Sequence, residues 1–259
     1  MDNLLTLTAL QWDLAWCNPS LNRERGESLM EMHRHSNAFF LPEMFTTGFT
    51  MNPVNNSETM DGPTVDWMRS QASKRNAWVC GSIIVQEEEA YYNRFLCFGP
   101  QGEGVHYDKR HLFSYAGENE RFQAGNKIVS IEIKGWKIKL MVCYDLRFPV
   151  WSRNNDDSDV MVYVANWPSV RRDAWNALLK ARAIENLSFV VGVNRVGRDA
   201  NNIDYQGETQ IIDYEGKLLA FLDQNEGLAT VTFSKDDLLT FRKRYPFLED
   251  RDQFFIKNI

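Results

Sequence analysis

The chain has 259 residues, of which 44% are hydrophobic and 25% are charged, which is an ordinary composition for a globular protein. These figures exclude a disordered chain, a collagen-like chain and a coiled-coil rod. Lysine and arginine number 29 against 35 aspartate and glutamate, giving a formal net charge of -6. This balance argues against nucleic acid or an anionic membrane as partner, because binders of both present a basic face.

The apolar segments of the chain are short. None approaches the ~18–20 consecutive apolar residues that a membrane span needs, and the run at 187–193 has the length of a strand. The N-terminus enters a strand-like alternation of Leu5, Leu7 and Ala9 with no basic region or cleavage site before it. We therefore expect a cytoplasmic protein.

No metal or cofactor motif is present in the sequence. Cys17, Cys80, Cys97 and Cys143 form no C-x-x-C pair, and neither G-x-x-x-x-G-K nor G-x-G-x-x-G occurs. No G-x-S-x-G serine elbow occurs either. We expect a protein without metal or cofactor, in which most cysteines are buried and at least one is a reactive thiol.

Strand and helix patterns alternate in the first half of the chain. Helical spacing predicts helices at 22–36 and 64–75. Apolar runs, several with period-2 alternation, predict strands at 5–11, 38–41, 77–85, 91–98, 104–107, 128–133 and 136–142.

The second half continues this alternation. We predict helices at 149–154 and 172–186, and a short helix and a tail at the end. We predict strands at 160–165 and 188–193, followed by a closing β-meander of 207–213, 217–221 and 228–233. No repeat or linker rich in Pro, Gly or Ser divides the chain, which favours one domain over residues 1–259. Strands separated by helices are typical of an α/β fold, and roughly a dozen strands fit two stacked sheets better than one open sheet.

Three ionisable residues follow three predicted strands. Glu43, Lys109 and Cys143 each come directly or nearly directly after a buried run. Ligands of α/β sheets bind beyond the carboxyl ends of the strands, so these side chains could meet at one edge. A carboxylate can take the thiol proton, and an ammonium can stabilise a thiolate and an oxyanion. Taken singly, each residue also has an ordinary explanation, as a core cysteine, a loop carboxylate and a charged surface turn.

Five segments together resemble the nitrilase superfamily of carbon–nitrogen hydrolases. They occur in the order that the family shows, and the likeness spans residues 5 to about 233. The resemblance implies a four-layer α-β-β-α sandwich and a catalytic triad of Glu43, Lys109 and Cys143. It also implies a second glutamate seven residues before a glycine, which selects Glu118, with Glu120 as the competing choice. The segments are 41–45, 107–113, 117–125, 142–149 and 181–186.

Within the superfamily, the runs 111–118 and 163–168 are most similar to the omega-amidase branch. That likeness implies hydrolysis of the omega-amide of small 2-oxo acids through a Cys143 thioester, with the amide as the only small-molecule partner. A substrate carboxylate would need a cation, for which Arg171 is the first choice and Arg172, Arg147 and Arg195 are alternatives. We also expect substrate-binding roles for Phe45, Thr47, Tyr144 and Trp167, although core or loop packing explains these residues equally well.

Other functions stay open at this point. A nitrilase, a carbamoylase or an aliphatic amidase would use the same triad on another substrate. A papain-like enzyme would need a histidine base, and only His111 lies near a matching motif. A non-catalytic interaction protein could have kept the fold. The resemblance also implies a homodimer.

Overall fold

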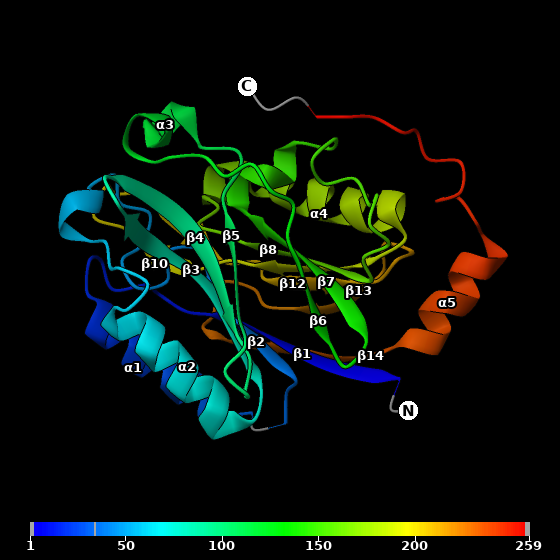
Figure 1. The fold of residues 1–259 in the computed structure, drawn as a ribbon, viewed down its shortest axis with the longest axis horizontal. Coiled ribbons are helices and arrows are strands. Elements are labelled where there is room, and N and C mark those ends of the chain that lie inside the picture. Colours follow the sequence, from blue (N-terminus) through cyan, green and yellow to red (C-terminus); the bar gives the residue numbers. More distant parts are fainter. Residues whose placement is uncertain (1–2, 34, 257–259) are drawn as a thin grey trace.

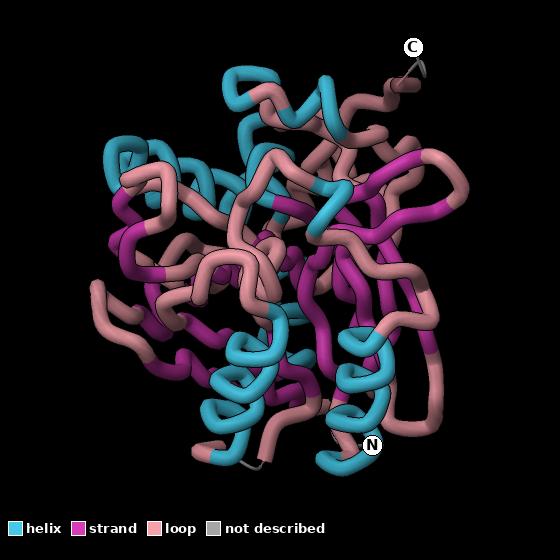
Figure 2. Tube along the Cα trace, turned by 90° about the vertical axis from the view of Figure 1, so that its left-hand side faces the viewer, coloured by secondary structure: helices cyan, strands magenta, loops and turns pink. Residues whose placement is uncertain are grey.

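Two six-stranded sheets stack face to face in the computed structural model, which describes residues 3–33 and 35–256 (Figure 1). The strand order is β14-β1-β2-β3-β4-β5 in the first sheet and β13-β12-β9-β8-β7-β6 in the second. Helices α1 and α2 cover the first sheet and α4 covers the second, and Figure 2 likewise shows strands between helices. The predicted α-β-β-α sandwich is confirmed.

The strands of the first sheet are β1 (Leu4–Gln11), β2 (Ala38–Phe40), β3 (Trp78–Glu87), β4 (Ala90–Phe98), β5 (Gly104–Asp108) and β14 (Gly227–Ser234). Those of the second are β6 (Ser130–Ile133), β7 (Trp136–Val142), β8 (Val160–Val164), β9 (Phe189–Val193), β12 (Gln210–Ile212) and β13 (Leu218–Phe221). A separate ribbon pairs β10 (Val196–Arg198) with β11 (Asp204–Gln206).

The α-helices are α1 (Pro19–Glu31), α2 (Pro63–Arg75), α3 (Glu118–Arg121), α4 (Arg172–Asn186) and α5 (Lys235–Arg244). Short 3-10 helices are η1 (Pro53–Asn55), η2 (Ser114–Ala116), η3 (Cys143–Arg147) and η4 (Ser169–Arg171). Within the described residues, no helix combines the length and the apolar character that crossing a bilayer requires.

The layers follow from the alternation of side chains along the strands. Leu5 and Leu7 of β1 are fully buried in the inner core, in one cluster with Ile138 and Leu140 of β7. The opposite face of the first sheet packs against α1 and α2, and Leu10 on that face belongs to a second, outer cluster. Each sheet is therefore apolar on both faces, as a middle layer requires.

Parallel strands at the centre of each sheet place their carboxyl ends, and the chain segments that follow them, along the same side of the sheet. β1, β2 and β3 run parallel in the first sheet, and β7, β8 and β9 run parallel in the second. Since β4 is antiparallel to both β3 and β5, β5 points the same way as β2. The residues that follow β2 and β5 thus share one edge of the first sheet, and those that follow β7 and β8 share one edge of the second.

Two predicted helices differ from the observed structure. The helix expected at 22–36 is α1, which begins at Pro19 because the Asn18 side chain accepts from the Leu21 N–H and caps the helix. The prediction of a helix at 149–154 is wrong, because this segment forms turns. The Asn154 backbone N–H donates to Asn186 Oδ1 instead of closing a helical turn.

The closing meander is formed only in part: its first two strands pair as predicted, but the third strand joins the other sheet. β12 and β13 pair in the second sheet, but β14 crosses to the first sheet and pairs antiparallel with β1, with Leu5 opposite Phe233. The Gln11 side chain at the end of β1 donates to the backbone oxygens of Asp223 and Asn225 at 2.6 and 2.8 Å, which holds the crossing loop. The ribbon of β10 and β11 was not predicted.

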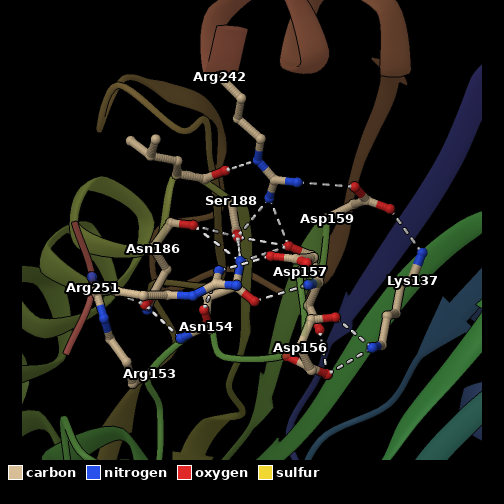
Figure 3. Close-up of polar contacts among 12 residues, drawn as sticks. Lys137, Arg153, Asn154, Asp156, Asp157, Asp159, Asn186, Ser188, Arg242 and Arg251 are labelled. Carbon is tan, nitrogen blue, oxygen red and sulfur yellow. Dashed lines mark hydrogen bonds and ion pairs between the residues drawn. The ribbon is translucent and has the colours of Figure 1, made fainter. Parts of the chain in front are cut away.

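The C-terminal segment is attached to the second sheet by a polar network (Figure 3). The Arg242 guanidinium on α5 donates to the backbone oxygens of Leu187 at 2.9 Å and Ser158 at 2.7 Å, and pairs with Asp159 at 3.3 Å. Arg251 donates to the backbone oxygen of Asn154 at 3.2 Å. α5 and the following residues are therefore joined to the body by charge-assisted bonds.

This network predicts that Arg242→Met lowers the free energy of unfolding by about 2–4 kcal/mol, because two partly buried backbone oxygens lose their charged donor. Urea unfolding followed by circular dichroism measures the loss. Lys243→Met is the matched control, since the neighbouring Lys243 side chain is exposed. Equal stabilities of the two variants would contradict the assignment.

Candidate active site

Cys143 lies on a strained turn directly after β7. It is the first residue of η3, and its φ of +44° is in the left-handed region, which costs a non-glycine residue about 1–3 kcal/mol. The Asp145 carboxylate closes the turn by accepting the Val142 N–H at 3.0 Å. The turn therefore places the sulfur beyond the end of the strand, at the edge of the second sheet.

The same carboxylate connects the two sheets. Asp145 is fully buried. Its carboxylate accepts a hydrogen bond from the Tyr107 hydroxyl at 2.7 Å and another from the backbone N–H of His111 at 3.0 Å. The Trp151 indole N–H donates in turn to the Tyr107 hydroxyl at 3.0 Å. Tyr107 and His111 flank Lys109, so Asp145 fixes the cysteine turn against the lysine loop. The sequence did not predict this role.

The Lys109 ammonium lies between two buried carboxylates. It donates to Glu43 Oε1 at 2.8 Å and to both oxygens of Glu118 at 3.0 and 2.8 Å, and its side chain is 1% exposed. The Asn93 side chain donates to the same two glutamates at 2.8 and 3.1 Å. Three of the residues that the resemblance selected are thus in direct contact.

The charges of this cluster decide the ionisation of its members. Burial lowers the pKa of Lys109, but the Glu118 and Glu43 carboxylates outweigh that effect and raise the pKa above its ordinary value. Burial raises the pKa of Glu118, and the Glu43 charge adds to this while Lys109 opposes it. One ammonium against two carboxylates leaves a local surplus of one negative charge when all three groups are ionised.

That surplus acts on the thiol of Cys143. Burial raises the pKa of the thiol well above its usual range, the Glu43 carboxylate raises it further, and Lys109 opposes the change. The raised pKa favours the thiol form of Cys143 over the thiolate. A carboxylate that acts on the pKa of the thiol in this way suits the role of a base that removes its proton.

Glu43 is held from both sheets. The Met44 that follows it also has a positive φ, of +43°, and its N–H donates to the Ser82 hydroxyl at 2.8 Å. From the second sheet, the Asn166 N–H donates to Glu43 Oε2 at 2.9 Å, and Asn166 Nδ2 donates to the Glu43 backbone oxygen at 2.6 Å. The carboxylate therefore has little freedom to rotate away from Cys143.

Glu118, which the resemblance selected, and Gly125 both lie against Lys109. Glu118 begins α3, and its carboxylate also accepts the Phe113 N–H at 2.6 Å, whereas Glu120 is exposed. The Gly125 N–H donates to the Lys109 backbone oxygen at 3.0 Å. A Cβ at position 125 would lie 2.2 Å from the Asp108 backbone oxygen, so only glycine lets this loop pack against the lysine.

A pocket of about 740 Å³ opens at Cys143. Three of the predicted substrate-binding residues, Tyr144, Trp167 and Arg171, line it. Phe45 and Thr47 do not belong to the lining. Phe45 packs in the outer core, 6.4 and 5.9 Å from the rings of Trp12 and Trp67, because its side chain points toward the helices and away from the cysteine. The Thr47 hydroxyl is buried and donates to the Gly48 backbone oxygen at 2.9 Å.

Two of the four candidate arginines reach this pocket. The guanidinium of Arg147 lies 5.0 Å from the Trp167 ring centroid, and that of Arg171 lies 5.1 Å from the Phe113 centroid. Among the described residues, neither has a carboxylate partner. Arg172 instead donates to Gln206 and pairs with Glu208, and Arg195 is fully buried against Asp13. The acidic residue Asp204 at the pocket wall pairs with Arg198 at 3.5 Å.

The arrangement of these groups is that expected of a thiol hydrolase. A cysteine, a carboxylate base and a buried ammonium beside an open pocket suit acyl transfer through a thioester. The family model "Carbon-nitrogen hydrolase" matches residues 12–243. The chain belongs to this family, and it is a hydrolase that acts on carbon–nitrogen bonds.

Relatives of known name cover nearly the whole chain. "Omega-amidase YafV" of Escherichia coli K12 is 42% identical over 251 residues, or 96% of this chain and 98% of that protein. "2-oxoglutaramate amidase" of Bacillus subtilis is 32% identical, over 95% of this chain and 96% of that protein. A CN-hydrolase superfamily structure from Xanthomonas campestris, with an arsenic adduct in its active site, has a TM-score of 0.96 and 41% identity, over 98% of this chain and 99% of that one. The resemblance to the omega-amidase branch of the nitrilase superfamily is confirmed.

The buried cluster predicts a pH-dependent loss of stability in Lys109→Met, which keeps an apolar stem and removes the ammonium. At pH 7 the free energy of unfolding should fall by about 3–5 kcal/mol, because two carboxylates stay buried without their cation. Lys109 lowers the pKa of Glu118, so its removal raises this pKa further above the ordinary value of ~4.3. A group with a raised pKa stabilises the fold at low pH and loses that contribution as the pH rises through its folded-state pKa.

The deficit of Lys109→Met relative to the wild type should therefore be smaller at pH 5 than at pH 7. Urea unfolding at both pH values measures it, and Lys127→Met, at an exposed lysine, is the control. A deficit that is the same at both pH values would contradict the cluster as described.

Proposed function

We propose that the chain hydrolyses the terminal amide of a small 2-oxo dicarboxylic acid monoamide, such as 2-oxoglutaramate, to the acid and ammonia. The observation that carries the proposal is the pocket at Cys143, which is lined by Arg147 and Arg171. Neither arginine has a carboxylate partner within the part of the chain that the structure describes. A substrate that carries a carboxylate at one end and an amide at the other complements such a pocket. The names of the Escherichia coli and Bacillus subtilis relatives support the same substrate class.

The first half of the reaction makes a thioester. Glu43 takes the proton from the Cys143 thiol as the sulfur attacks the amide carbon, which forms the C–S bond and puts the negative charge on the carbonyl oxygen. The C–N bond then breaks, and Glu43 returns its proton to the departing nitrogen, which leaves as ammonia. The raised pKa of Cys143 is consistent with this order, because the proton leaves only as the bond to carbon forms.

The second half releases the acid. Glu43 takes a proton from a water molecule, whose oxygen attacks the thioester carbon. The C–S bond breaks, and the Glu43 proton returns to the sulfur. The enzyme is then in its starting state, and the net change is one amide and one water converted to one acid and one ammonia.

In both halves the charged oxygen needs donors. We propose that the Lys109 ammonium and the backbone N–H of Tyr144 supply them. Glu118 is a positioning residue that keeps Lys109 in place, because it contacts the ammonium through both of its oxygens. Tyr144 and Trp167 form pocket walls in this proposal, and Arg171 with Arg147 holds the substrate carboxylate.

Cys143→Ala should abolish ammonia release, because no other described cysteine lines the pocket. Lys109→Ala should reduce kcat by about 10²–10³, the usual effect of losing one oxyanion donor. A coupled ammonia assay measures both, and Cys17→Ala is the control because this cysteine lies outside the pocket lining. Ammonia release by Cys143→Ala would rule out the mechanism.

The substrate is tested with wild-type protein on 2-oxoglutaramate, glutamine, a simple aliphatic amide, a nitrile and an N-carbamoyl amino acid. We expect the highest kcat/KM on 2-oxoglutaramate. Activity on the nitrile alone would indicate a nitrilase, and carbon dioxide released with ammonia would indicate a carbamoylase. Failure of every substrate, with a Cys143 no more reactive toward iodoacetamide than the other cysteines, would favour a non-catalytic protein.

Arg171→Met should raise KM for 2-oxoglutaramate at least ~10-fold, because this is the usual effect of losing one charge-assisted hydrogen bond on binding. It should change kcat/KM for an uncharged aliphatic amide less than ~3-fold, because that substrate offers no carboxylate. Arg172→Met is the matched control, since its guanidinium contacts Gln206 and Glu208. An unchanged KM in Arg171→Met would remove this residue from the carboxylate site.

We also propose a homodimer and a cytoplasmic location, as the sequence suggested. A gel-filtration mass of one subunit would refute the dimer.

A further inference from the structure

Asn166 lies just beyond the end of β8, the strand that neighbours the one preceding Cys143. β7 and β8 are parallel, with Val142 opposite Val164. Cys143 is the first residue beyond β7, and Asn166 is the second residue beyond β8. The carboxyl ends of these strands bring both residues to the same pocket, whose lining includes them both.

The amide group of Asn166 is oriented by its contact with Glu43. Its Nδ2 lies 2.6 Å from the Glu43 backbone oxygen, which can only accept, so the amino group must face that oxygen. The Oδ1 atom therefore points elsewhere. It is buried and has no hydrogen-bond partner among the described residues, and the residue as a whole is 4% exposed.

An unpartnered buried acceptor is rare in folded proteins. Among the described pocket-lining residues, Asn166 is the one that has such a side-chain oxygen. Asn93 also has one, but it does not belong to the pocket lining. The acceptor lies on a residue that contacts Glu43 and lines the same pocket as Cys143, so a ligand group in this pocket that meets it lies near both residues.

The donor and acceptor groups of an amide indicate which part of a ligand would meet Asn166 Oδ1. When the carbonyl oxygen of an amide faces donors such as the Lys109 ammonium, its nitrogen turns to the opposite side and needs acceptors. The Glu43 carboxylate is largely occupied, since Lys109 and Asn93 donate to Oε1 and the Asn166 N–H donates to Oε2. Asn166 Oδ1, in contrast, accepts no hydrogen bond from the described residues.

We propose that Asn166 Oδ1 accepts one N–H of the substrate's primary amide and so selects primary amides over esters of the same acyl group. The inference rests on Cys143 being the nucleophile of the proposed function. A site that is built to bind an N–H rejects an analogue without one, because the buried acceptor is then left unpaired. The same bond gives the nitrogen a partner as it leaves as ammonia.

The test compares an amide and the methyl ester of the same acid, both hydrolysed through Cys143. Asn166→Ala should lower kcat/KM for the amide at least ~30-fold more than for the ester, because the ester never uses the acceptor. Asn93→Ala is the matched control. It removes a donor to Glu43 from outside the pocket lining, so it should lower the two rates by the same factor. Equal losses in Asn166→Ala would overturn the proposal, because they are the result expected of a residue that only positions Glu43.

A binding experiment decides the matter if the wild type hydrolyses the ester too slowly to measure. In the Cys143→Ala background, calorimetry compares Kd for the amide and the ester with and without Asn166→Ala. We expect Asn166→Ala to raise Kd ~10-fold or more for the amide and less than ~3-fold for the ester. Equal changes for both ligands would overturn the inference.

These outcomes are separate from those of the proposed function. If 2-oxoglutaramate is not a substrate, the same comparison uses an aliphatic amide and its ester. The proposed substrate class can then fail while the role of Asn166 stands, and the reverse result is equally possible.

Discussion

The buried ammonium of Lys109 is the interaction on which the rest of the site depends. A lysine with 1% of its side chain exposed is tolerated only because two carboxylates and their own donors surround it. Glu43 comes from the end of β2, Lys109 from the end of β5, and Glu118 from α3. Removal of Lys109 would leave two buried carboxylates without their cation, so its ion pairs fix these segments relative to one another. The surplus negative charge of the cluster raises the pKa of the Cys143 thiol.

The two sheets contribute different parts of the site and must be kept in register. Two contacts between the sheets do this. Asp145 from the cysteine turn reaches Tyr107 beside the lysine, and Asn166 from the end of β8 reaches Glu43. Both are short polar bridges at the rim of an otherwise apolar interface, where the low dielectric strengthens them. The apolar core holds the sheets together, and these bridges fix the loops that carry Glu43 and Cys143 relative to each other.

The sequence predicted the layers and most strands well because buried strands have a strong local pattern. It also indicated Glu43, Lys109 and Cys143, since each follows such a strand, and the resemblance gave Glu118. It did not predict the bridges of Asp145 and Asn166, because pairing across sheets depends on tertiary contacts that no local pattern carries. The placement of Phe45 and the path of β14 were missed for the same reason: both depend on which face or sheet a segment joins, and an apolar run is compatible with either.

The pairing of β14 with β1 has a consequence for how the chain is made. β1 and β14, the first and last strands of the described residues, are neighbours, so the sheet that carries Glu43 and Lys109 lacks its outer strand until residues beyond 227 have left the ribosome. The strands β6 to β13 of the second sheet all precede that point. During translation the sheet that precedes Cys143 can therefore be completed first, and the sheet that carries Glu43 and Lys109 is completed only when β14 has been made.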